Sequence, residues 1–474
     1  MVSLQIPGLG GLTGLLSPSE WQKSLDDLTT LALDRRLRLA VTGLRQSGKT
    51  VFITSAVHHL LTGRQLPFLR AVAEKRLLGS QLAPRTPGDL PGFPFAETRA
   101  ALAGTSPHWP EPTHALASLR STLRFTTKGM LRQRLAERAA LTLDVIDYPG
   151  EWLLDLPMLE QDFATWSGAM LDLAERPPRD RLAAEWRAFT NDLDADAAAS
   201  LEVAHQAAEL YRAYLLRCQR EEGLSLLQPG RFTMPGELAG DDLLDFCPLP
   251  SGPSPRGSLR ALMAERYERY RSHVVRRFYA DHFRHFDRQI VLVDVLSLLN
   301  RGRAAFDDAK AALGAVLESF RYGRSGLIGR LFRPRIETLL FAATKADHVA
   351  YNQHPNLSLL LEHMVADAAG RARFEGIQPA FVALAALKST DTVQTEHHGQ
   401  VLSCVRGRLK GEDRETILFP GEIPPDLPDE SDWDSGRFRF RDFAPRRLEL
   451  RPGERPQHIR LDQALEVLIG DHLL

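Results

Sequence analysis

Cysteine is scarce in this chain of 474 residues, which contains only three. Cys218, Cys247 and Cys404 lie far apart, their number is odd, and no two of them form a CxxC pair. This spacing argues against a disulfide framework and against a zinc ribbon. We interpret the three as small buried side chains in a protein of a reducing compartment.

Long apolar runs and an excess of one charge are missing as well. No stretch approaches the roughly 20 apolar residues that a membrane-spanning helix needs, and residues 1–16, although apolar, lack the basic segment of a secretory signal. The chain has 59 Lys and Arg against 60 Asp and Glu, whereas nucleic-acid-binding proteins usually carry a basic excess. We therefore expect a cytoplasmic protein with no transmembrane segment and no nucleic-acid partner.

The sequence alternates between short apolar strands and helical stretches, which is typical of an α/β protein with a parallel sheet. Residues 79–113 and 226–256 are rich in Pro and Gly and are predicted to be mainly loop. Residues 151–220 are predicted to be helical, with one break at Pro177-Pro178. Further helices are expected at 17–33, 96–103, 258–286 and 461–472, strands at 118–126, 289–295, 336–344, 379–386, 401–406 and 416–419, and a loop at 420–436.

The most specific feature is an uninterrupted match to G-x-x-x-x-G-K-[ST] at residues 43–50. A strand is predicted before it at 37–41 and a helix after it at 49–61. The backbone N–H groups of such a loop surround phosphate oxygens, the Lys reaches the β- and γ-phosphates, and the Thr is a ligand of Mg²⁺. The motif predicts a nucleoside-triphosphate site formed by Gly43, Gln46, Ser47, Gly48, Lys49, Thr50 and Val51.

A second motif, Asp147-Tyr148-Pro149-Gly150, follows a strand predicted at 141–146. An acidic side chain at this position can hold Mg²⁺ through a water, and the N–H of Gly150 can contact the γ-phosphate. The next residue is Glu151, where signalling GTPases usually have a Gln that orients water. We expect Glu151 to act with Lys49 in catalysis, or else to begin a helix beside a packed Trp.

A third motif, Thr344-Lys345-Ala346-Asp347, follows a predicted strand and resembles the [NT]-K-x-D element that recognises guanine. The Asp347 carboxylate can accept two hydrogen bonds from guanine, but it would face an acceptor on adenine. The Lys345 stem would lie over the base, and the backbone of Ala386 and Leu387 would support it. The predicted ligands are GTP or GDP with Mg²⁺. The alternative is that Thr344 or Asp347 caps a helix.

Two roles have several candidates. A threonine should complete the Mg²⁺ ligands together with Thr50 and Asp147, and we prefer Thr113 to Thr122. An arginine of this chain could stabilise charge on the γ-phosphate. The candidates are Arg45, Arg99, Arg120 and Arg124, each of which could equally be a solvated surface side chain.

Six segments together resemble the YcjX-like family of bacterial P-loop NTPases, and the resemblance extends from about residue 18 to the end. They are residues 43–50, 147–152, 288–294, 344–347, 419–422 and 438–443. The resemblance implies a Ras-like nucleotide domain with large helical insertions, as in the α subunit of a heterotrimeric G protein. It also implies a link to envelope stress, and with it a protein partner at the inner membrane, where the chain would be peripheral.

The predicted fold is therefore α/β, a P-loop NTPase of the Ras-like type with large helical insertions. We expect an N-terminal segment and helix at 1–36, the nucleotide-binding domain at 37–150 and 287–400, a helical insertion at 151–286, and C-terminal strands and a helix at 401–474. The predicted function is a stress-linked switch that hydrolyses GTP slowly, since no catalytic Gln is apparent. The alternatives are an ATPase of the same fold, a kinase, or a scaffold that holds nucleotide and contacts a partner through its insertion and the basic residues 321–335.

Overall fold

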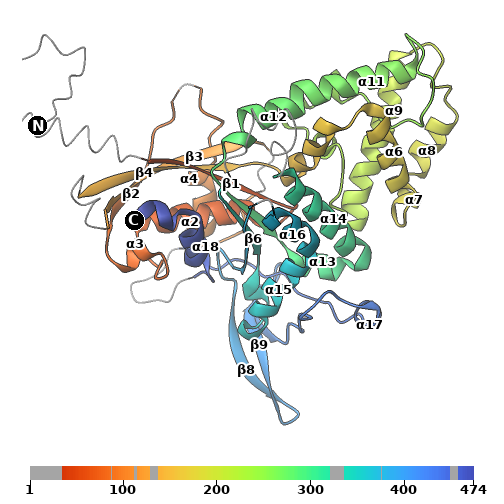
Figure 1. Ribbon diagram of the computed structural model, residues 1–474. Coiled ribbons are helices and arrows are strands. Elements are labelled where there is room, and N and C mark those ends of the chain that lie inside the picture. Colours follow the sequence, from red (N-terminus) through yellow and green to blue (C-terminus); the bar gives the residue numbers. More distant parts are fainter. Residues whose placement is uncertain are drawn as a thin grey trace, which may run out of the picture.

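A central sheet of seven strands organises the computed structural model, which describes residues 35–86, 88–111, 115–128, 137–320, 336–374, 376–448 and 457–474. Its strand order is β2-β3-β4-β1-β5-β6-β7 (Figure 1). Strands β4, β1, β5, β6 and β7 run parallel, and β2 and β3 are antiparallel additions at one edge. The strands are β1 Arg35–Gly43, β2 Leu77–Leu82, β3 Ala117–Thr126, β4 Arg138–Asp147, β5 Arg288–Val293, β6 Thr338–Ala343 and β7 Pro379–Ala383.

The sheet separates two hydrophobic cores, which explains why its parallel strands are apolar throughout. Ile290 and Leu292 of β5 face one core, and Val291 and Val293 face the other. The first core is covered by α2 (Lys49–Thr62) and α18 (Leu461–Ile469), and the second by α13 (Val295–Arg301), α14 (Arg303–Ser319), α15 (His354–Met364) and α16 (Ala366–Phe374). The predicted α/β class with a parallel central sheet is confirmed.

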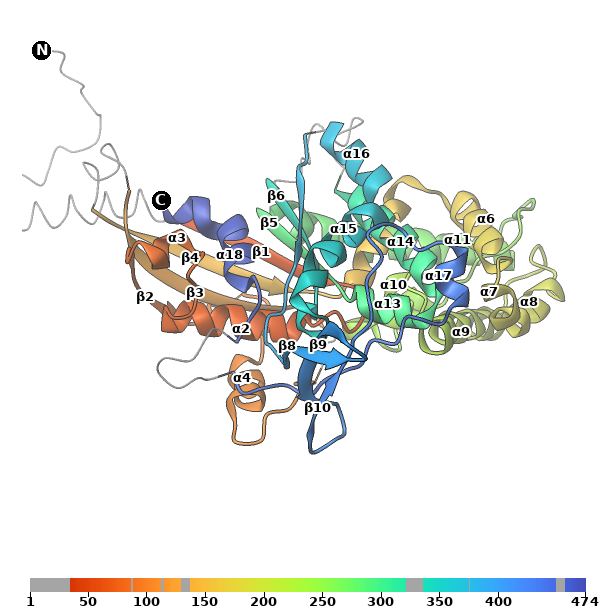
Figure 2. The ribbon, with the colours of Figure 1, turned by 90° about the horizontal axis from the view of Figure 1, so that it is seen from below.

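A helical insertion follows Gly150 and extends to β5, to one side of the sheet (Figures 1 and 2). Its core is aromatic: Trp166, Trp186 and Tyr267 are all fully buried. The prediction of one long helical stretch with a single break was wrong, because 3-10 and π turns and loops divide it. The elements are η1 Gly150–Glu160, α6 Phe163–Ala174, α7 Arg179–Leu182, α8 Ala184–Asn191, α9 Leu201–Arg217, η2 Cys218–Glu222, α10 Gly230–Thr233, η3 Gly236–Leu238, η4 Asp242–Leu244, α11 Leu259–Tyr270, η5 Arg271–Val275, α12 Arg276–Asp281 and η6 Phe283–His285.

The C-terminal part forms a separate antiparallel sheet of three strands that projects from the body (Figure 1). Its strands are β8 Thr390–His397, β9 Gln400–Arg408 and β10 Glu415–Leu418. We did not predict β8 because its sequence is polar on both faces. The strand is stabilised by pairing with β9 and not by burial of an apolar face. Likewise β2 lies partly in the predicted loop at 79–113, since its largely exposed residues pair with β3.

The other predicted elements within the described residues agree with expectation apart from their ends, whereas the helix predicted at 17–33 lies outside those residues. The helix predicted at 96–103 is α4 (Phe95–Ala103), and the last predicted helix is α18 followed by the 3-10 turn η9 (Gly470–Leu473). Short elements not predicted are α3 (Arg70–Ala73), η7 (Ala346–His348), η8 (Tyr351–Gln353) and α17 (Glu430–Asp434), the last inside the predicted loop at 420–436. None of the helices in the described ranges has the length and apolar character needed to cross a bilayer.

Candidate functional site

The three motifs meet at one edge of the sheet. Residues 43–50 follow β1, residues 147–150 follow β4, residues 344–347 follow β6, and Ala386 and Leu387 follow β7. These four strands are parallel, so their carboxyl ends lie at the same edge, where open α/β sheets bind their ligands. The structure therefore brings the described residues of these motifs to one edge, whereas the alternative threonine, Thr122, lies within β3 opposite Thr142. Thr113 lies outside the described residues.

The loop at residues 43–50 has the backbone of an anion site. Gln46 and Gly48 are left-handed, with φ of 60° and 85°, and such turns direct successive N–H groups to one point. The Leu44 N–H donates to Leu292 O at 3.2 Å, and the Ser47 N–H to Leu44 O at 3.2 Å, which fix the loop on β5. The first-turn N–H groups of α2 have no intrahelical acceptor, as in any helix, and Gly48 before them offers no side-chain cap. These N–H groups can therefore bind an anion.

The polar side chains of this loop suit phosphate and Mg²⁺. Lys49 has no acidic partner among the described residues, and its charge is available to an anion. Thr50 and Asp147 are buried and supply a hydroxyl and a carboxylate, the oxygen ligands that Mg²⁺ accepts. The Ser47 hydroxyl is buried with no hydrogen-bond partner in the described part of the chain, which leaves a polar group for a ligand to satisfy.

Gly150 lies directly against the phosphate loop. A Cβ on Gly150 would come within 2.5 Å of the Gly43 carbonyl oxygen, so only glycine allows this approach. Glu151 follows at the start of η1 and is buried. It lines an open depression together with Arg45 and Gln46 of the loop and with Gln219 and Arg301. Its catalytic role stays a prediction.

The expectation of a packed Trp beside Glu151 is confirmed. Trp152 is buried, and its indole N–H donates to Met234 O at 3.2 Å. The Arg231 guanidinium lies 3.3 Å from the centre of the Trp152 ring, a cation–π contact. The segment after Gly150 is therefore held inside the helical insertion.

The third motif is positioned by two neighbouring strands. The Thr344 N–H donates to Val293 O at 2.9 Å, which fixes the motif beside the end of β5. Asp347 is buried, and its Oδ2 accepts the N–H of Ser389 at 2.6 Å. The alternative interpretation as a helix cap was wrong, because η7 begins after Lys345 without a side-chain cap and Asp347 bonds to a distant loop instead.

Lys345 is held from two sides. Its Nζ lies 2.6 Å from Asp294 Oδ2, at the end of β5, and 3.2 Å from Asp442 Oδ1, in the C-terminal part. Burial alone would lower the pKa of the Lys345 ammonium, but the two carboxylates outweigh burial and the pKa is raised. The Lys345 side chain is therefore charged and confined.

The sequence analysis did not identify three residues that contact this motif: Ser389, Asp294 and Asp442. Ser389 had a signal, since it follows Ala386 and Leu387 by two to three positions. Asp294 and Asp442 lie in segments that carry the family resemblance, but nothing local pairs them with Lys345.

The loop after β7 is buried, and backbone hydrogen bonds hold it on both sides of Ala386 and Leu387. The Ala385 N–H donates to Ile459 O at 3.0 Å, and the Lys388 N–H to Gln457 O at 2.7 Å. Between them, the N–H groups of Ala386 and Leu387 donate to no described backbone carbonyl. Their contact with a base stays a prediction.

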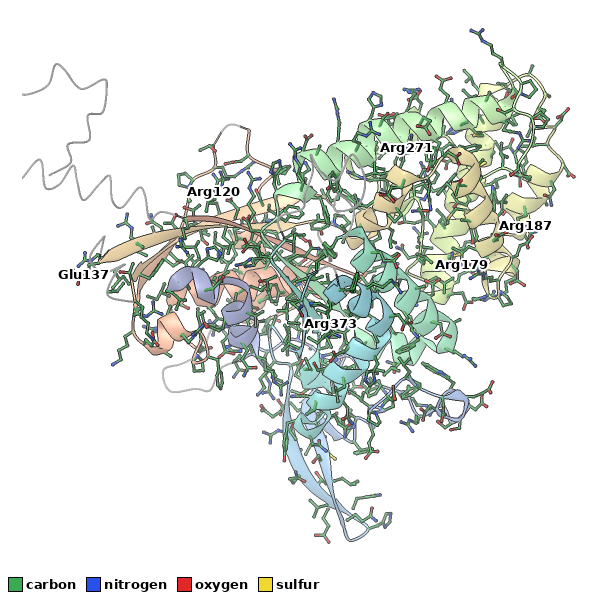
Figure 3. The ribbon with its side chains drawn as sticks, in the orientation of Figure 1. Arg120, Glu137, Arg179, Arg187, Arg271 and Arg373 are labelled. Atoms are coloured by element: carbon green, nitrogen blue, oxygen red, sulfur yellow. The ribbon has the colours of Figure 1, made fainter. Side chains whose placement is uncertain are left out.

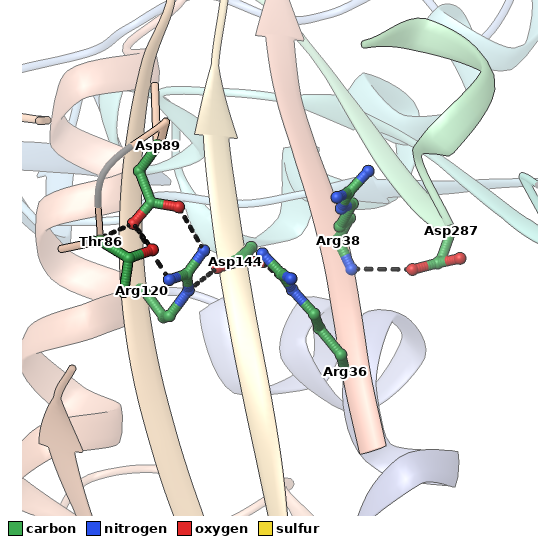
Figure 4. Close-up of polar contacts among 7 residues, drawn as sticks. All are labelled: Arg36, Arg38, Thr86, Asp89, Arg120, Asp144 and Asp287. Carbon is green, nitrogen blue, oxygen red and sulfur yellow. Dashed lines mark hydrogen bonds and ion pairs between the residues drawn. The ribbon is translucent and has the colours of Figure 1, made fainter. Parts of the chain in front are cut away.

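The structure distinguishes among the arginine candidates. Arg120 pairs with Asp144 at 2.6 Å and with Asp89 at 2.9 Å, and Arg36 also contacts Asp144 (Figure 4). These pairs lie on the sheet surface, well apart from Arg179 of the insertion (Figure 3).

The other three differ in their place relative to the phosphate loop. Arg99, on α4, donates to His58 Nδ1 at 3.3 Å. Arg124 is on β3, opposite Gly79 of β2. Arg45 is on the phosphate loop, and its Nη1 donates to Gln219 Oε1 of the insertion at 3.3 Å. Its position on the phosphate loop therefore makes Arg45 the favoured candidate for stabilising charge on the γ-phosphate.

Comparison with known proteins adds a family to this geometry. The model of the YcjX-like family (DUF463) matches residues 37–473. A Ras-like GTPase YcjX of Escherichia coli is 41% identical over 465 residues, which cover 95% of this chain and 99% of that protein. A Ras-like GTPase YcjX of Shewanella oneidensis is 38% identical over 463 residues, which cover 93% of this chain and 95% of that protein.

Proposed function

The chain belongs to the YcjX-like family, and from that membership and its site we propose a Ras-like GTP-binding protein that hydrolyses GTP slowly. The observation that carries the proposal is the joint position of two recognition elements at one sheet edge. The first is the phosphate loop before α2, whose Lys49 has no acidic partner among the described residues. The second is the buried Asp347, which Ser389 orients and which suits guanine.

In the proposed mechanism, residues 43–51 bind the phosphates through backbone N–H groups and Lys49. Thr50 and Asp147 would hold Mg²⁺, which when bound neutralises phosphate charge. The Gly150 N–H, beside the loop, responds to the presence of the γ-phosphate. Glu151 accepts a hydrogen bond from the attacking water, and hydrolysis is slow because Glu151 stands where signalling GTPases have a Gln that orients this water.

Base selection follows from the chemistry of Asp347. Ser389 contacts Oδ2, so the carboxylate plane is fixed before the base arrives. Guanine offers N1–H and a 2-amino group to this carboxylate, whereas adenine offers an acceptor. This argument favours GTPase over ATPase activity. The kinase alternative is not tested, because the Arg-rich residues 324–335 lie outside the described residues.

The decisive test is calorimetric titration of GTP, ATP and xanthosine triphosphate with Mg²⁺. We expect Lys49→Ala to lose all three and the wild type to prefer GTP to ATP by roughly 100-fold or more. Asp347→Asn should weaken GTP and favour xanthosine triphosphate. The matched control is Asp413→Asn, an exposed acid that should change nothing. Equal binding of ATP and GTP by the wild type would contradict guanine recognition.

We also propose that the GTP-bound form acts as a stress-linked switch, cytoplasmic and peripheral to the inner membrane through a protein partner. The family resemblance supports this part of the proposal. Flotation with vesicles made from inner-membrane extract, with and without GTP, tests it. We expect more protein to float with the vesicles when GTP is present. Equal flotation with and without GTP would contradict a nucleotide-dependent switch.

A further inference from the structure

The C-terminal residues 438–448, which we name the strap, cross the sheet edge that carries the candidate site. At one end, Asn300 of α13 accepts the Phe440 N–H at 2.8 Å and donates to Phe440 O at 2.7 Å. At the other end, the Leu448 N–H donates to Leu102 O of α4 at 2.9 Å. The strap therefore joins a helix after β5 to a helix between β2 and β3.

Its middle lies on the base-recognition motif. Asp442 contributes the second carboxylate on Lys345, at 3.2 Å. Phe443 is fully buried, and its ring centre lies 5.1 Å from that of His348, the residue after Asp347. The Trp109 indole N–H donates to Phe443 O at 2.9 Å. The strap thus contacts the base-recognition motif through the Asp442 carboxylate and through the packed Phe443 ring.

Restraint of the Lys345 side chain favours binding of a base, because less conformational freedom is lost. An unrestrained Lys side chain loses conformational freedom when it is immobilised. Asp294 and Asp442 restrain the Lys345 ammonium before any base arrives, so less freedom is lost on binding. Departure of a base requires the covering stem to move, which the same two contacts resist.

We propose that Asp442 is a positioning residue for the nucleotide base, and that the strap, by holding Lys345, slows nucleotide release. This inference rests on the proposed guanine-nucleotide site. Asp294 is buried and also accepts the Ser297 N–H at the start of α13. Asp442, whose side chain is 63% exposed, can be altered without that second effect.

The test is the dissociation rate of a fluorescent GDP from the full-length protein with Mg²⁺, chased with excess GDP. An exposed ion pair contributes at most about 1 kcal/mol, so Asp442→Asn should speed release by roughly three- to fivefold. Asp442→Glu, which keeps the charge, should restore most of the slow rate. Asp434→Asn, an exposed acid on α17, is the matched control.

Ionic strength separates positioning from a loosened structure. Salt screens an exposed ion pair, so the wild-type rate should approach the Asp442→Asn rate as salt rises, while the variant changes little. The melting temperature of nucleotide-free protein should be the same for both. A wild type that releases GDP as fast as Asp442→Asn at low salt overturns the inference alone. A wild type that holds no guanine nucleotide overturns the proposed function with it.

Discussion

At the scale of single residues, two glycines allow the phosphate loop to lie close to β5 and to the segment after β4. A Cβ on Gly43 would lie 2.4 Å from Leu292 O, and one on Gly150 would lie 2.5 Å from Gly43 O. Both obstacles are backbone atoms, which cannot rotate away as a side chain can. Glycine at residue 150 therefore allows the approach to the loop, and glycine at residue 43 allows the loop to lie against β5.

We expect Gly150→Ala to push the 147–150 segment off the loop. Affinity for a GTP analogue should fall more than affinity for GDP, because the Gly150 N–H is proposed to contact only the γ-phosphate. The control is Gly168→Ala in α6, where a Cβ would meet nothing within 4 Å. That change should be neutral or stabilise by up to about 1 kcal/mol. Equal losses for both nucleotides would contradict the γ-phosphate contact.

At the scale of elements, η1 is tied to the insertion by a buried carboxylate. Asp155 Oδ1 accepts the Gly230 N–H at 2.7 Å, and Oδ2 accepts the Tyr270 hydroxyl at 2.5 Å. Burial raises the pKa of Asp155 to about 6, although both hydrogen bonds oppose the shift. The segment after Gly150 is thus joined to α10 and α11.

This pKa gives a pH dependence with a definite sign. An ordinary Asp has a pKa of about 4, so the folded protein binds more protons than the unfolded chain between about pH 4 and pH 6. The Asp155 contribution to the free energy of unfolding should fall as pH rises through this window, by up to about 3 kcal/mol. Urea unfolding should show this slope in the wild type and lose it in Asp155→Asn. An unchanged slope in the variant would refute the assignment.

At the scale of the whole molecule, a buried ion pair fastens the helical insertion to the sheet domain. Arg179 of α7 lies 2.5 Å from Asp308 Oδ1 of α14, and both side chains are buried. Asp308 Oδ2 also accepts the N–H groups of Ser225 and Leu226, at 2.6 and 2.7 Å. The insertion is therefore anchored to the core near the depression beside the phosphate loop.

Removing this carboxylate should destabilise the protein strongly. Asp308→Ala leaves Arg179 buried without its carboxylate, which typically costs about 3–5 kcal/mol. Its neighbour Asp307 faces solvent and pairs weakly with Arg303 at 3.6 Å, so Asp307→Ala should cost under about 1 kcal/mol. Hydrogen exchange should rise at residues 225–230 in Asp308→Ala only. Equal exchange in the two variants would mean that the pair is not the anchor.

Much of the site could be predicted because its parts are local. Residues 43–50, 147–150 and 344–347 each follow an apolar strand directly, and continuous apolar strands separated by helices indicate a parallel sheet. Parallel strands place their following loops at one edge, so motif and order together predicted which residues would meet. The sequence by itself thus determined the α/β class and the edge that carries the site.

The tertiary structure alone decided which distant groups support those motifs. Ser389 reaches Asp347 across 42 residues, and Asp442 reaches Lys345 across 97. It also formed β8 and β2, whose exposed sequences carry no hydrophobic period, and divided the insertion into short helices. Such features depend on which backbone and charged groups lie adjacent after folding. A local sequence pattern cannot predict such contacts, because the two partners can lie any number of residues apart in the chain.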